Sequence, residues 1–127
     1  MQYKRETQKN IFGNDLEVCS NEPLTGFFRD GCCNTCIEDV GSHTVCVELT
    51  QEFLEFSAAN GNDLSTPRPE FNFLGLKPGD RWCLCASRWV EAEEQGKAPL
   101  IVGKATNEEA LKIIPKTRLR KYLIILN

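Results

Sequence analysis

The sequence of 127 residues lacks the features that mark membrane-spanning and secreted proteins. No apolar run approaches the roughly 18 residues that a membrane-spanning helix requires. The N-terminus, MQYKRETQKN, has no apolar segment after its charged residues, so no signal peptide is visible. We therefore expect a cytoplasmic protein without a membrane partner, in which residues 1–9 are frayed and residues 10–127 form a single α+β domain.

An excess of positive charge is also lacking. The chain has 15 Lys and Arg residues against 18 Asp and Glu residues, which gives a formal net charge of -3. Charges of both signs are mixed along most of the chain, and no glycine-rich phosphate-binding pattern is present. Nucleic acid is therefore not an expected partner, and the sequence does not predict an oligomeric state.

Cysteine, in contrast, is abundant, with seven residues. In a cytoplasmic protein most of them should be reduced, and the odd number agrees with this expectation. Their clustering then indicates packing, metal binding or thiol chemistry.

Two short segments alternate in polarity as half-buried strands do. His43 to Leu49 sends its valines to one face and Cys46 to the other, and Trp82 to Ala86 separates Cys83 and Cys85 from its apolar residues in the same way. If the two strands are neighbours, the three thiols share one face of a sheet.

Helices are expected after both strands. Thr50 should cap a helix that ends at Asn60-Gly61, and Ser87 should cap one that ends before Gly96. A short strand at 100–102, a capping box at Thr106 that opens a helix through Ile114, helical turns after Pro115 and a docked apolar tail at 122–126 complete the chain. This order favours a two-layer α+β sandwich, a small sheet with helices on one face and long loops over the other; a doubly wound α/β domain is the alternative.

The long loop from Cys19 to Ser42 runs directly into the first strand, so it is placed to cover the cysteine face. Three interpretations of the resulting cluster stay open. In the first, reduced cysteines only pack. In the second, the cluster holds zinc or another thiophilic metal, because Cys32-Cys33-x-x-Cys36, His43-x-x-Cys46 and Cys83-x-Cys85 offer more ligands than the four of a tetrahedral site.

The third interpretation is a redox or nucleophilic enzyme. Cys32 or Cys33 would be the attacking sulfur, His43 the base, and Arg29 would favour the thiolate, while Asp30 is a further acid or base candidate. The Cys33-Asn-Thr-Cys36 segment lacks the preceding strand and following helix of a thioredoxin motif.

Five motifs along the chain resemble one bacterial family, the uncharacterised proteins called domain of unknown function 2237. The motifs are GFFRDGCC at 26–33, EDVGSHTVC at 38–46, FLEFS at 53–57, GNDLSTPRPEF at 61–71 and GLKPGDRWCLC at 75–85. Cys36 departs from the family pattern, where glycine is expected, and so does Leu74, where proline is expected. The resemblance therefore implies a metal site without Cys36, built from Cys32, Cys33, Cys46, Cys83 and Cys85. The resemblance implies a small α+β domain with no assigned activity, and it adds Arg68, Asp80 and Arg81 as candidates for cofactor or ligand binding.

These observations predict a small cytoplasmic domain with a loop-covered Cys/His/Arg/Asp site that binds a metal or a small anionic ligand. A cysteine-dependent enzyme is one alternative. The other is a partner-binding module that uses the loop at 66–69, in which the cysteines only pack.

Overall fold

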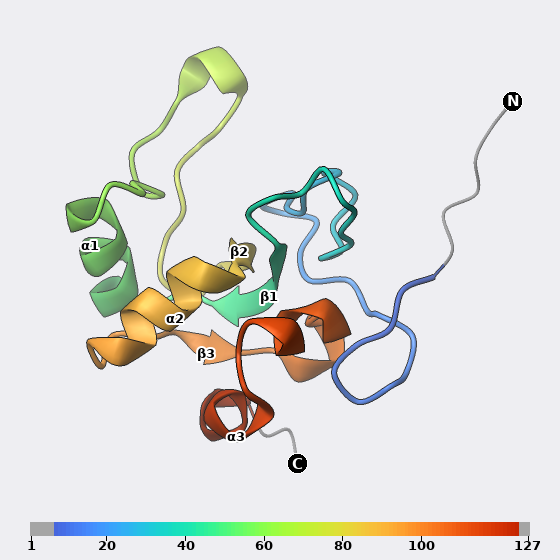
Figure 1. Ribbon diagram of the computed structural model, residues 1–127. Coiled ribbons are helices and arrows are strands. Elements are labelled where there is room, and N and C mark those ends of the chain that lie inside the picture. The colour runs from blue at the N-terminus through green and yellow to red at the C-terminus, as the bar shows by residue number, and fades with distance from the viewer. Residues whose placement is uncertain (1–6, 125–127) are drawn as a thin grey trace, which may run out of the picture.

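The computed structural model describes residues 7–124 and contains a three-stranded sheet with helices around it (Figure 1). The strands are β1 (His43–Glu48), β2 (Arg81–Cys85) and β3 (Leu100–Ile101). The α-helices are α1 (Gln51–Ala59), α2 (Ala86–Glu94) and α3 (Lys116–Leu119). Short 3-10 turns lie at Pro69–Phe71, Gly103–Ala105, Glu108–Lys112 and Arg120–Tyr122. The expected α+β class is confirmed, and the two-layer sandwich stays a prediction.

The sheet has the order β2-β1-β3, and both pairings are antiparallel. Cys46 is the direct partner of Cys83, and Val47 is the partner of Trp82. The register shifts by one residue between His43 and Val45, so that His43 is opposite Cys85. Such an irregularity redirects a side chain relative to a regular ladder.

The buried residues of the sheet belong to two separate clusters. The valines of β1 and Leu84 of β2 pack with the helices, where Trp89 of α2 and Phe53 of α1 are almost completely buried. A second cluster contains only small residues: Cys19, Cys33, Cys46, Cys83 and Ala105. The alternation of the two strands therefore separated an apolar core from a cysteine cluster, as the sequence predicted.

The helix predictions were partly correct. Thr50 caps α1, accepting a hydrogen bond from the Phe53 N–H at 3.1 Å, as expected. The prediction that Ser87 caps the next helix was wrong, because α2 begins at Ala86 and Cys85 is its N-cap residue. Thr106 does not cap the following segment either: Asn107 accepts from the Glu109 N–H and opens a 3-10 turn. The Thr106 hydroxyl instead accepts a hydrogen bond from the Cys46 N–H of β1.

Two loops surround this framework. The loop at 62–80 projects from the body beyond α1, as Figure 1 shows in yellow-green. The loop at 19–42 lies beside the start of β1. Gln8 and Lys9, from the segment expected to be frayed, form hydrogen bonds with Thr35 and Asp15 respectively. Leu123, from the apolar tail, packs against the core as expected. Residues 1–6 and 125–127 lie outside the described residues. Within residues 7–124, no helix has both the length and the apolar character needed to cross a membrane.

Candidate functional site: a cysteine cluster and a histidine-aspartate pair

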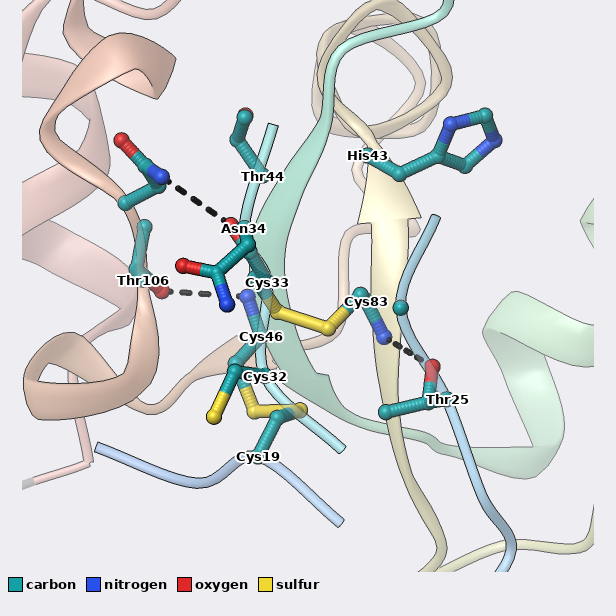
Figure 2. The surroundings of a disulfide bond; sticks show 12 residues. Cys19, Thr25, Cys32, Cys33, Asn34, His43, Thr44, Cys46, Cys83 and Thr106 are labelled. Carbon is teal, nitrogen blue, oxygen red and sulfur yellow. Dashed lines mark hydrogen bonds between the residues drawn. A yellow bond between two sulfur atoms is a disulfide. The ribbon is translucent and has the colours of Figure 1, made fainter. Parts of the chain in front are cut away.

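The cysteine cluster consists of two neighbouring disulfides (Figure 2). Cys46 of β1 is bonded to Cys19, with 5.7 Å between the Cα atoms, and Cys83 of β2 is bonded to Cys33, with 5.3 Å between them. The expectation that the cysteines are mostly reduced was therefore wrong, since four of seven are paired. It rested on the expected compartment, whereas the pairing follows from the loop at 19–42, which brings one cysteine onto each strand.

Two threonine hydroxyls hold the strands at the level of the disulfides. The Cys83 N–H donates to the Thr25 hydroxyl at 2.8 Å, and the Cys46 N–H donates to the Thr106 hydroxyl at 3.1 Å. Thr25 and Thr106 are themselves fully buried. Each therefore satisfies a buried backbone donor that no neighbouring strand reaches at this position.

Of the five predicted metal ligands, the structure brings three together. Cys33, Cys46 and Cys83 lie in the cluster, and Cys19, which was not predicted as a ligand, completes it. The sulfur atoms of Cys19, Cys33 and Cys46 all lie within 4.8 Å of one another, so the cluster could hold a metal ion. Cys32 and Cys85 belong to neither disulfide and are partly buried. A signal for Cys19 was its position at the start of the covering loop.

Two of the predicted catalytic residues, Arg29 and His43, line one cavity with Cys83, the disulfide partner of Cys33. Cys33 is bonded to Cys83 and has no exposed surface, so its sulfur is not a nucleophile in this state. Asp30 accepts hydrogen bonds from the Cys32 N–H and from the Asn34 amide, which are turn contacts. Arg29 lies over the Trp82 ring, with its guanidinium carbon 5.2 Å from the ring centre.

His43 is paired with Asp39, which was not among the predicted site residues. The His43 Nδ1 lies 2.7 Å from one carboxylate oxygen of Asp39. The other oxygen accepts from the His43 N–H and from the Thr35 hydroxyl, both at 2.9 Å. Asp39 thus fixes both the backbone and the ring of the histidine.

The charge state of Asp39 follows from these contacts. Burial by itself would raise the pKa of its carboxyl group, but the hydrogen bonds from the His43 ring, the His43 N–H and Thr35 together outweigh burial and lower the pKa. The side chain of Asp39 has no exposed surface, whereas that of His43 is 41% exposed. A buried carboxylate therefore supports a solvent-facing imidazole.

The three residues predicted to bind a cofactor have local contacts of other kinds. Arg68 is exposed and pairs with Phe73 through the backbone of the 62–80 loop. Asp80 accepts from the Lys77 N–H and closes a turn, and Arg81 lies 3.5 Å from Glu48. Their role in ligand binding stays a prediction.

The comparisons with known proteins bear on the family only. No curated protein matches the chain. The model of a family described as an uncharacterized protein conserved in bacteria (DUF2237) matches residues 9–123. This match covers almost the whole chain and both disulfides, and it agrees with the resemblance that the five sequence motifs indicate. The chain therefore belongs to the DUF2237 family.

Proposed function

We propose that this is a zinc-binding cytoplasmic protein in which Cys19, Cys33, Cys46 and Cys83, when reduced, are the four ligands. One observation carries the proposal: three of the sulfur atoms lie within 4.8 Å of one another, and the fourth is bonded to one of them. A tetrahedral site with Zn–S bonds of about 2.3 Å separates its sulfurs by about 3.8 Å. The four thiolates need to move only by ångströms to reach that arrangement.

The burial of the ligands favours a structural role for the ion. None of the four cysteines is more than 5% exposed. Four protein ligands leave no open position for water or substrate, which is typical of structural zinc sites. The ion would join the covering loop to both central strands, as the disulfides do in the oxidised chain.

The oxidised chain with two disulfides and the reduced chain with four thiols differ by four electrons. Reduction of both disulfides by a dithiol or phosphine takes up four electrons and four protons and yields four thiols. Zinc binding then displaces the four thiol protons. A reducing cytoplasm supplies the electrons, which is why we place the protein there.

The experiment compares the oxidised chain with the chain reduced by tris(2-carboxyethyl)phosphine. Each sample is incubated with zinc, desalted and analysed by elemental mass spectrometry, while circular dichroism reports folding. We expect about one zinc per reduced chain and none per oxidised chain. Cys19→Ser should abolish stoichiometric binding, and the matched variant Cys36→Ser should not, because Cys36 lies outside the cluster.

Two results would contradict the proposal. One is a reduced chain that stays folded and binds no zinc. The other is a reduced chain that unfolds and does not refold when zinc is added, since a structural ion couples binding to folding.

A further inference from the structure

A cavity of about 440 Å³ lies beside β2, one of the two edge strands of the sheet, and Cys83 is the one proposed zinc ligand among the residues that line it. The groups around it that can do chemistry are a thiol, an imidazole and two guanidinium groups. They belong to Cys85, His43, Arg29 and Arg88, and Phe27 also lines the cavity.

The thiol and the imidazole are neighbours across the sheet. Cys85 and His43 are opposite each other in the antiparallel register, and both line the cavity. Regular pairing would have placed Thr44 opposite Cys85, and the register shift puts His43 there. Cys85 belongs to neither disulfide, and its sulfur lies 3.2 Å from the Ser87 hydroxyl.

The orientation of the histidine suits a base. Because Nδ1 donates to the buried Asp39 carboxylate, Nε2 is left as the acceptor. The Phe27 ring stacks against the imidazole, with 6.4 Å between ring centres. Gly41 leaves room for it, since a Cβ atom at that position would lie 2.8 Å from the His43 Cε1.

The two arginines make the cavity electropositive. Arg29 donates to the Gly26 carbonyl at 2.8 Å and lies over Trp82, and neither contact cancels its charge. Arg88 donates to the Asn60 carbonyl at 3.0 Å and is partly neutralised by Glu91 at 3.3 Å. The cavity therefore favours a ligand with a negative group next to its reactive atom.

We propose that Cys85 is a nucleophile for small carbon electrophiles that carry a carboxylate, with His43 as its base and Arg29 as the anion-binding residue. The thiol proton passes to the His43 Nε2, the sulfur forms a bond to the electrophilic carbon, and the leaving group departs with the electron pair of the bond that breaks. This site goes beyond the zinc proposal, because it uses a different thiol and operates with both disulfides intact.

The test is alkylation of the oxidised chain, followed by mass spectrometry of each cysteine peptide. Iodoacetate carries the carboxylate, iodoacetamide is its neutral counterpart, and iodide is the leaving group of both. Cys36 is the internal control. Its thiol donates a hydrogen bond to the Glu38 carboxylate and lowers the pKa of Glu38, so a negative charge lies beside the Cys36 thiol. We expect the ratio of the iodoacetate rate to the iodoacetamide rate to be about tenfold higher at Cys85 than at Cys36.

Two variants separate the roles. Arg29→Gln should remove the preference for iodoacetate at Cys85, measured as a fall in the ratio of the iodoacetate rate to the iodoacetamide rate. His43→Gln should slow both reagents at Cys85 by about tenfold or more. If that variant does not fold, Gly41→Ala, which displaces the ring, should slow both reagents instead.

Equal rate ratios at Cys85 and Cys36 would overturn anion recognition, and a Cys85 rate insensitive to both His43→Gln and Gly41→Ala would overturn the base. Since no zinc is present and the disulfides stay closed, neither result depends on the zinc proposal.

Discussion

Cys46 of β1 and Cys83 of β2 are direct partners across the sheet, yet each is bonded to a cysteine of the covering loop and not to the other. A bond between them would join two strands that the ladder already holds. The observed pairs instead fasten the loop at 19–42 to both strands, at two points 14 residues apart in sequence, Cys19 and Cys33. The covering loop, and the pocket that its Phe27 and Arg29 line, therefore depend on the cysteine cluster.

Loss of the second disulfide should destabilise the chain. Cys33 and Cys83 are separated by 50 residues, and closing a loop of that length lowers the entropy of the unfolded chain by an equivalent of about 4 kcal/mol. We expect the double variant Cys33→Ala/Cys83→Ala to lose about 2–4 kcal/mol of unfolding free energy in urea under oxidising conditions. Cys36→Ala is the control and should change it by less than about 1 kcal/mol. Equal losses in both variants would contradict the cross-link's role.

The Asp39 carboxylate should make stability depend on pH. Its pKa is lower in the folded chain than in the unfolded chain, so its contribution is complete above the unfolded value, about 3.9, and is lost as the pH falls through the folded value. Asp39→Asn should cost about 1–3 kcal/mol at pH 7, and the difference from the wild-type chain should shrink below about pH 4. Urea unfolding at pH 7 and pH 3 measures the two differences. A difference independent of pH would mean that Asp39 does not act through its charge.

The Thr25 hydroxyl should stabilise β2, because it accepts the hydrogen bond of the Cys83 N–H. Thr25→Val keeps the shape of the side chain but leaves the buried Cys83 N–H without an acceptor, which costs about 1–3 kcal/mol. Thr25→Ser keeps the hydroxyl and should lose less. Chemical unfolding of both variants, with the disulfides intact, gives the comparison, and a valine variant as stable as the serine variant would show that the hydrogen bond contributes nothing.

Gly26 should tolerate no side chain. It has a φ of +101°, and a Cβ atom there would lie 2.4 Å from the Cys32 carbonyl oxygen, in the backbone of the same loop. Gly61 has a similar φ of +88° with open space around it, so it is a matched control. We expect Gly61→Ala to cost about 1–2 kcal/mol for the backbone conformation alone, and Gly26→Ala to cost about 1–3 kcal/mol more. Equal costs would show that the loop shifts freely.

Prediction from the sequence succeeded where a pattern is local. The alternation in β1 and β2 separated valines from cysteines because side chains of a strand leave alternate faces, and Thr50 capped α1 because its hydroxyl reaches an N–H three residues away. The loop at 19–42 was expected at the cysteine face because it runs directly into β1. These properties depend on neighbours within a few residues.

The tertiary structure decided which of these residues meet. Thr106 reads as a helix cap, but its hydroxyl is taken by the Cys46 N–H, 60 residues away, because β3 is too short to pair there. His43 has the parity of the apolar face, and only the register shift places it opposite Cys85. The sequence by itself therefore determined the family, the α+β class and the face on which the cysteines lie. The disulfide partners and the pairing of His43 with Asp39 and Cys85 were decided by long-range packing, because they depend on where a 24-residue loop, Cys19 to Ser42, settles on the sheet.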